Sequence, residues 1–122
     1  DAAIINIGVK YVITVEDGYR QEVVLRSINS RLSNYFSIEK MHINKPVVVG
    51  EVENLILNTQ GVVSIVSLNF PTFTAANNIT GNVYSTHSYD AKSMIDRGYI
   101  FPPDGGIFEV KFPSDDIKGR VI

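Results

Sequence analysis

The segment INKPVVVGEVENLILNTQGVVSIVSLNF, residues 43–70, combines a turn, a short helix and a long apolar strand, and these patterns decide the predicted fold. Pro46 restricts the residue before it to extended geometry, which indicates a short extended piece at 38–45. A helix is predicted to begin at Val49 or Gly50, because carboxylates in its first turn complement the helix dipole and apolar residues form a buried stripe. The carboxylates are Glu51 and Glu53, and the stripe is Val52, Leu55 and Ile56.

The second half of this segment predicts a strand. Gly61 is placed to end the helix as a left-handed cap. The run VVSIVSLNF that follows it (62–70) is apolar on both faces for most of its length. Strands of this kind lie in the interior of a sheet. We therefore expect a central strand that is covered by helices on one side.

Upstream, the sequence alternates with a period of two and then changes to a helical period. In IINIGVKYVITVE (4–16), one face is apolar and the other mostly polar, as in a half-buried strand, and Asp-Gly at 17–18 ends it. Apolar residues in 19–36 share one arc of about 120°, which predicts an amphipathic helix of about five turns. Glu22 precedes Arg26 by four residues, which favours an ion pair. The apolar residues are Ile5, Ile7, Val9, Tyr11, Ile13 and Val15 in the strand, and Val24, Leu25, Ile28, Leu32, Tyr35 and Phe36 in the helix.

Downstream, residues 71–106 form a long stretch rich in Asn, Thr, Ser, Gly and Tyr, which predicts a polar loop. Within it, DAKSMIDRG (90–98) predicts a helical turn with an aspartate cap and a glycine stop. IFEVKF (107–112) alternates and predicts a strand, and DIKGRVI (116–122) predicts a short final strand. The order of elements predicts an α+β fold: a small mixed β-sheet with two helices packed on one face and a long polar loop insertion.

Length, composition and charge narrow the function classes. The 122 residues fit a single domain, 1–122, and a hydrophobic content of 44% argues against disorder. The net charge is −2 with no basic stripe, so we expect no nucleic acid partner. No apolar run approaches the roughly 20 residues that span a bilayer, so we expect no membrane partner. The chain lacks cysteine, which excludes disulfides and thiolate metal sites. Because residue 1 is aspartate and not methionine, we expect a fragment of a larger polypeptide.

The sequence contains two histidines, and neither has the spacing of a zinc or iron site. A hydrolytic constellation could be drawn from His87 with Asp90 and one of the serines beside it, Ser85 or Ser88. The alternative is a polar surface loop, the more common setting for these residue types.

Paired acids are the other candidates for catalysis, because general acid–base chemistry needs two carboxylates that face each other across a cleft. Neighbours in sequence do not establish that geometry. The alternatives are helix N-terminal charge for Glu51 and Glu53, and a solvated turn for Asp115 and Asp116. We therefore assign no catalytic, cofactor-binding or metal-binding residue and expect no cofactor.

Aromatic side chains recur along the predicted loop. Aromatic residues on a long polar loop are typical of protein interfaces, and the alternative is that they pack beneath the loop. The final strand could pair with the sheet edge of another chain or within its own chain. The predicted interface residues are Phe73, Tyr84, Tyr89, Tyr99, Phe101, Val121 and Ile122.

Two segments, RLSNYFSIEKMHINKPVVVGEVENLILNTQGVVSIVSLNF (31–70) and GIFEVKFPSDDIKGRVI (106–122), resemble the C-terminal domain of baseplate wedge subunits from contractile-tailed, T-even-like phages, and the broader baseplate assembly family. The resemblance covers residues 20–70 and 98–122. It implies a C-terminal fragment of a larger structural protein of the virion, located in the tail baseplate and made in the host bacterial cytoplasm. It also implies a homodimer that assembles with other baseplate wedge proteins into the baseplate ring and is not an enzyme.

Two functions of other classes stay open. A small hydrolase would require His87 to converge with a serine and an aspartate in a pocket. A peptide-binding adaptor module would be monomeric and would have an open sheet edge.

Overall fold

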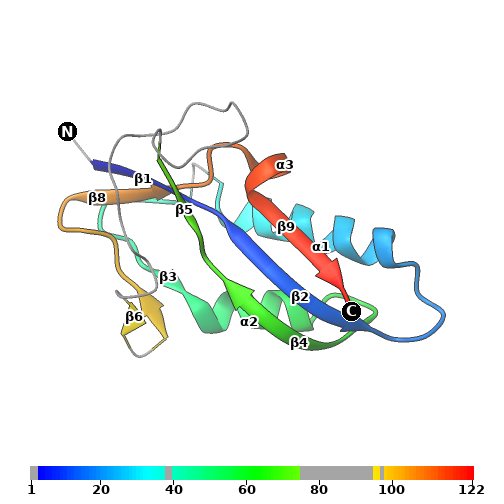
Figure 1. Cartoon of the computed structure of the whole chain (residues 1–122). Coiled ribbons are helices and arrows are strands. Elements are labelled where there is room, and N and C mark those ends of the chain that lie inside the picture. Colours follow the sequence, from blue (N-terminus) through cyan, green and yellow to red (C-terminus); the bar gives the residue numbers. More distant parts are fainter. Residues whose placement is uncertain (1–2, 38–39, 75–94, 97) are drawn as a thin grey trace.

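The structure, a computed structural model, describes residues 3–37, 40–74, 95–96 and 98–122. It confirms the expected α+β fold, with the two longer helices behind the strands in Figure 1. The helices are α1 (Gln21–Tyr35), α2 (Val49–Leu57) and α3 (Pro113–Asp116). The strands are β1 (Ala3–Ile7), β2 (Val9–Val15), β3 (Val47–Val48), β4 (Val62–Asn69), β5 (Thr72–Phe73), β6 (Ile95–Asp96), β7 (Tyr99–Ile100), β8 (Gly106–Glu109) and β9 (Ile117–Val121).

The described strands form three small sheets in place of the expected single one. Two of these sheets, β5-β1-β8 and β4-β2-β9, have the same topology, because each middle strand has one antiparallel and one parallel neighbour. β1 and β2 are consecutive in the chain, as are β4 and β5, so the two sheets continue into each other. The third sheet, β3-β7-β6, is antiparallel. The sheets are mixed, as predicted.

Gly8 separates β1 from β2, where the sequence predicted one unbroken strand over 4–16. A Cβ atom at this position would lie 2.4 Å from the carbonyl oxygen of Asp116 and 2.7 Å from the Phe73 ring. The Gly8 N–H donates a hydrogen bond to the carbonyl oxygen of Pro71 at 2.8 Å. The strand therefore changes sheets where three chain segments meet, at a point that leaves no room for a side chain. The predicted apolar face is confirmed across the break, from Ile5 to Ile13.

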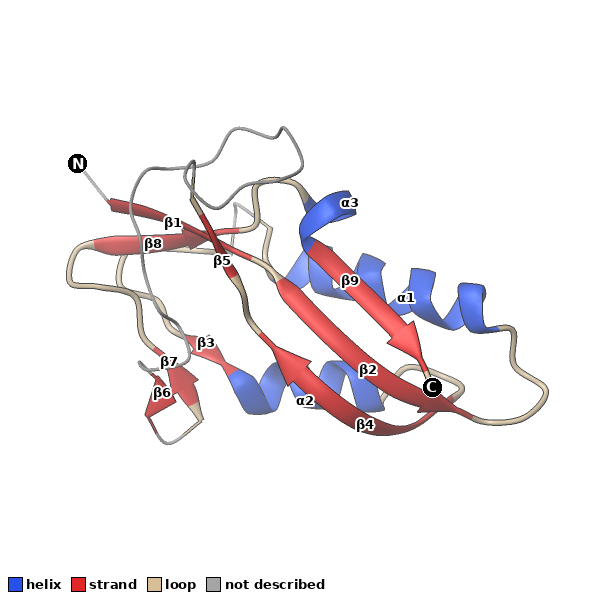
Figure 2. Ribbon diagram, viewed as in Figure 1, coloured by secondary structure: helices blue, strands red, loops and turns tan. Residues whose placement is uncertain are grey.

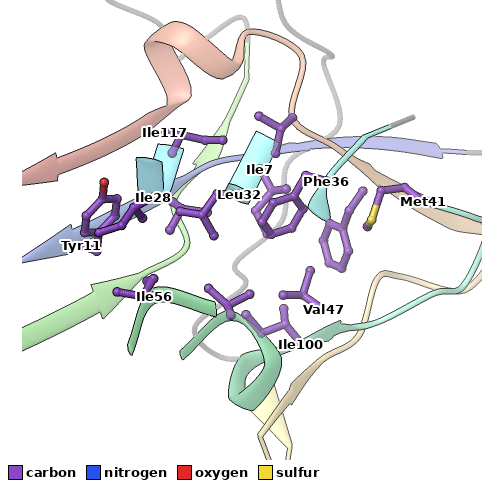
Figure 3. Packing of buried hydrophobic residues seen from close by; sticks show 14 of the residues in the cluster. Ile7, Tyr11, Ile28, Leu32, Phe36, Met41, Val47, Ile56, Ile100 and Ile117 are labelled. Atoms are coloured by element: carbon purple, nitrogen blue, oxygen red, sulfur yellow. The ribbon is translucent and has the colours of Figure 1, made fainter. Parts of the chain in front are cut away.

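The helices α1 and α2 cover one face of the β4-β2-β9 sheet (Figure 2). Both were predicted from their apolar stripes. In Figure 3, Ile28 and Leu32 of α1 lie together with Tyr11 of β2 and Ile117 of β9. Each large apolar side chain that is fully buried in such a cluster contributes about 1.5–3 kcal/mol. Tyr35 links the helices, because its hydroxyl donates a hydrogen bond to Oε1 of Glu51 at 2.9 Å.

Tyr11 passes beneath Gly119 of β9 to reach α1. Its hydroxyl donates a hydrogen bond to Oδ1 of Asn29 at 2.6 Å, and a Cβ atom on Gly119 would lie 2.0 Å from Tyr11 Cζ. The tyrosine ring therefore occupies the space that a side chain on Gly119 would need. This contact fixes β9 against both β2 and α1.

The strand predicted at 62–70 is confirmed as β4, but its predicted central position is wrong: within the described chain, β4 is an edge strand that pairs with β2 alone. Its register shifts twice, so that Val63 and Val66 have no counterpart on β2. These are two β-bulges, and the two valines are 61% and 53% exposed. The sequence of β4 is therefore apolar on both faces because the bulged valines point to solvent. The strand is not buried on both sides.

Other local expectations are corrected by the contacts that the structure shows. Residues 95–96 form β6, which pairs with β7, where a helical turn was predicted over 90–98. Residues 75–94 of the predicted loop lie outside the described residues. The solvated turn expected for Asp115 and Asp116 is wrong, because both residues lie in α3 and Asp116 is 3% exposed; Asp115 alone is exposed to solvent. Glu22 pairs with Arg20 at 2.8 Å and not with Arg26.

We expect Gly119→Ala to lower the free energy of unfolding by about 1–3 kcal/mol, because the added methyl group overpacks the space held by the Tyr11 ring. Urea denaturation measures this change. Gly50→Ala is the control, because no atom lies within 4 Å of a Cβ at this helical position, and it should leave stability unchanged or raise it. Equal effects of the two substitutions would contradict the proposed contact.

Stability should fall at alkaline pH. Burial, with the hydrogen bond to Glu51, raises the pKa of Tyr35 to about 12 from 10.0. The folded state thus holds this proton more tightly than the unfolded chain, so the stabilisation is present below pH 10 and is lost as the pH rises toward 12. Burial also raises the pKa of Tyr11.

The measurement is the urea midpoint at about pH 8 and about pH 11, across the window in which the tyrosine proton is lost. Tyr35→Phe should lose less stability over this interval than the wild type. Tyr19→Phe, on the exposed turn before α1, is the matched control. The same alkaline loss in the Tyr35→Phe variant would refute this role of Tyr35.

Candidate interaction surface

Two exposed aromatic rings lie together at the β7 hairpin, the antiparallel pair of β6 (Ile95–Asp96) and β7 (Tyr99–Ile100). Tyr99 and Phe101 are 41% and 43% exposed, and their ring centroids lie 5.8 Å apart with an interplanar angle of 26°. Ile100 between them is fully buried and pairs with Val47 of β3. Because side chains alternate along a strand, burial of Ile100 directs both rings outward. The structure thus presents a stacked aromatic pair on a backbone that is anchored in the core.

The turn that follows the aromatic pair is held by Asn44. The Asn44 side-chain oxygen accepts a hydrogen bond from the Gly105 N–H at 2.8 Å, and the Asn44 N–H donates to the Gly106 carbonyl at 2.8 Å. Asn44 and Gly105 both adopt positive φ, of 64° and 77°. The Gly106 N–H closes the turn on the Pro103 carbonyl at 2.7 Å. The turn after Phe101 is therefore held by these hydrogen bonds and by the positive φ angles of Asn44 and Gly105.

The other predicted interface residues lie apart from this pair. Phe73 is half-buried and packs against Gly8, as in the alternative in which loop aromatics pack inward. Val121 is half-buried and pairs with Ile13, so the last strand pairs within its own chain. Ile122 is 68% exposed, and Figure 1 places the C-terminus far from the β7 hairpin. Tyr84 and Tyr89 lie outside the described residues.

Several exposed apolar residues were missed by sequence reasoning. Val63 and Val66 on β4 were interpreted as buried, and only the bulges in the pairing with β2 reveal their exposure. Ile43, in the turn before β3, is 56% exposed. Its position between the polar residues His42 and Asn44, three residues before Pro46, was the one available signal.

The residues of the hydrolase hypothesis, Ser85, His87, Ser88 and Asp90, lie outside the described residues. In the part of the chain that the structure describes, no three histidine or carboxylate side chains lie close enough together to hold a metal ion. A cavity of about 410 Å³ lies between the start of β1, the end of α1 and β8. The described lining is mostly apolar and also contains Ser33, Ser37, Glu109 and Lys111, so it suits a ligand with a large apolar part.

A comparison with protein families identifies the fold. Residues 5–85 match the Baseplate J-like protein C-terminal domain. The chain belongs to this family. The matched segment contains β2, α1, β3, α2, β4 and β5, and it ends before β7 and β9. No curated protein matches the chain.

Membership establishes the broad role of this Baseplate J-like domain. It is a structural part of a phage tail baseplate, located in the tail of the virion, and it interacts with other baseplate proteins. The resemblance to the baseplate assembly family is thereby confirmed. Domains of this family are generally not enzymes. Among the described helices, none combines the length and apolar character needed to cross a membrane.

We expect Asn44→Ala to destabilise the turn that supports the aromatic pair. It removes the side-chain hydrogen bond with Gly105 and places an alanine at a positive φ. Together these changes should lower the free energy of unfolding by about 1–3 kcal/mol. Asn44→Gly keeps the backbone conformation and loses only the hydrogen bond, so its unfolding free energy should lie between those of the wild type and Asn44→Ala. Thermal and urea denaturation measure the order, and identical stability of the three proteins would contradict it.

Proposed function

We propose that this Baseplate J-like domain belongs to a wedge subunit and helps to assemble the baseplate ring through direct protein contacts. In this proposal residues 1–122 form one domain in the C-terminal part of a larger structural protein. The observation that carries the proposal is the stacked pair of Tyr99 and Phe101, exposed on a hairpin that is fixed to the core. A wedge subunit must hold neighbouring proteins at defined positions, and rigid anchored side chains suit that task.

The aromatic pair has the chemistry of an interface anchor. Aromatic residues are enriched at binding hot spots, because they bury a large area and lose little conformational freedom. Stacking of the two rings restricts both before any partner binds, which lowers the entropic cost of association. The buried Ile100 and the Asn44 contacts restrict the backbone as well. A partner pocket that covers both rings would therefore gain burial at small ordering cost.

We further propose a two-fold homodimer in which the same patch of each copy meets its counterpart. Tyr84 and Tyr89 join Tyr99 and Phe101 in this proposal. Phe73 and Val121, which are half-buried and lie apart from the aromatic pair, contribute their exposed atoms to further contacts of the assembly. Ile122, directly after β9, forms a second contact. Other wedge proteins then bind the surface that the dimer leaves open.

The test is the solution mass of the chain over a range of concentrations, by light scattering after size exclusion. We expect a dimer for the wild type, and a dimer at least about tenfold weaker for Tyr99→Ala/Phe101→Ala, because two hot-spot rings are truncated. The control Val23→Ala/Leu57→Ala removes two exposed apolar side chains of α1 and α2 and should keep the dimer. A dimer that is unchanged by the aromatic substitutions would refute the assignment of the interface, and a strict wild-type monomer would refute the homodimer.

A further inference from the structure

The outer face of the β4-β2-β9 sheet is a second surface available for contact. α1 and α2 lie behind this sheet in Figure 2, and no described element packs on the side turned to the viewer. Thr14 and Ser64 meet on this face, where their hydroxyl groups form a hydrogen bond of 2.5 Å. Val63 and Val66, the extra residues of the two bulges, are exposed beside them. One half of the outer face is therefore neutral and partly apolar.

The other half of the outer face is cationic. Lys10 of β2 lies directly opposite Lys118 of β9, and Arg120 lies opposite Val12. All three cations are exposed, and among the described residues none of them forms an ion pair. Like charges directly opposite each other destabilise a pair of strands. A chain with a net charge of −2 thus retains an unfavourable local concentration of positive charge.

The cations surround a shallow hollow of about 270 Å³. Its lining also includes Ser67 and Asn69 of β4, so the hollow extends from the cationic strand to the bulged strand. Carboxylates are absent from its described lining. A ligand seated here would meet positive charge, the Ser67 hydroxyl and the Asn69 side chain, and Val66 is exposed next to Ser67 on the same strand. This combination fits a protein segment that carries both acidic and apolar side chains.

Nucleic acid fits this face less well. Binding of single strands uses exposed aromatic rings as stacking platforms, and Tyr11, the aromatic residue of the hollow, is 2% exposed and lies beneath Gly119. The valines of β4 would face solvent in a complex with phosphates alone. A partner contacts both halves of the face only when it carries apolar groups next to its negative charges.

We propose that this face docks an acidic, partly apolar segment of a neighbouring baseplate subunit. Its carboxylates pair with Lys10, Lys118 and Arg120, and its apolar side chains pack against Val63 and Val66. The inference rests on the assembly role proposed above and adds the chemistry of one partner. The Tyr99–Phe101 pair is not part of this contact.

A labelled peptide of alternating glutamate and valine residues is the probe, and fluorescence anisotropy measures its binding to the 122-residue chain. We expect Lys118→Glu/Arg120→Glu to weaken binding at least about tenfold, because paired charges become repulsive. Lys118→Gln/Arg120→Gln removes the charge with less disturbance and should weaken binding in the same direction. Arg26→Glu/Lys40→Glu introduces the same charge change elsewhere and should leave binding unchanged. Val63→Ser/Val66→Ser should weaken binding without changing its salt dependence.

The proposal is overturned if the peptide does not bind. It is also overturned if Lys118→Glu/Arg120→Glu and Arg26→Glu/Lys40→Glu weaken peptide binding equally. It is also overturned if an oligothymidylate of equal charge binds as tightly as the peptide, since a general anion or nucleic acid surface would then explain the cations. Circular dichroism confirms that each variant is folded. Light scattering on the same samples separates this proposal from the homodimer: Lys118→Glu/Arg120→Glu should keep the dimer, and Tyr99→Ala/Phe101→Ala should keep peptide binding.

Discussion

The close approach at Gly8 is the constraint on which the arrangement of the sheets depends. The backbone there lies against the Asp116 carbonyl and the Phe73 ring, and its N–H bonds to the Pro71 carbonyl. One extended segment can therefore serve as the middle strand of two sheets in succession. Any larger residue would displace the start of β9 or the end of β5. The order of strands, the placement of α3 and the path of the C-terminus all follow from this crowded crossing.

The buried core lies on one face of the β4-β2-β9 sheet, and two other surfaces of the domain are exposed to solvent. α1 and α2 are bound to the inner face by the buried cluster. Tyr11 of β2 is also hydrogen-bonded to Asn29 of α1, and Tyr35 joins the two helices to each other. The β7 hairpin is attached through Ile100, and its neighbouring rings remain exposed. The domain thus combines a rigid interior with surface features of distinct chemistry: an aromatic pair at one end and a cationic and apolar sheet face. This division suits a structural part of a baseplate, which contacts several neighbours.

Sequence periodicity predicted the features that depend on local alternation. The helical arc over 19–36 corresponds to α1 at Gln21–Tyr35, and the apolar face of 4–16 is buried as expected. The break at Gly8 could not be predicted, because the alternation continues through it and the cause is contact with residues 73 and 116. Residues 95–96 were predicted to lie in a helical turn. They form β6 instead, because pairing with β7 overrides the local preference. Tyr99 and Phe101 were predicted as interface residues because they are aromatic residues on a loop. Their stacking could not be predicted, because it depends on the β7 hairpin.

The two bulges of β4 have a consequence for crowded assemblies. A regular edge strand offers an evenly spaced row of backbone donors and acceptors, on which the strand of another molecule can align. The eight residues of β4 contain no charge and no proline, so a flat edge here would promote stacking of identical domains. Extra residues at Val63 and Val66 interrupt that spacing and increase the local twist. Copies of the domain that lie close together would then not polymerise through their sheets, and association is left to side chains that recognise a specific neighbour.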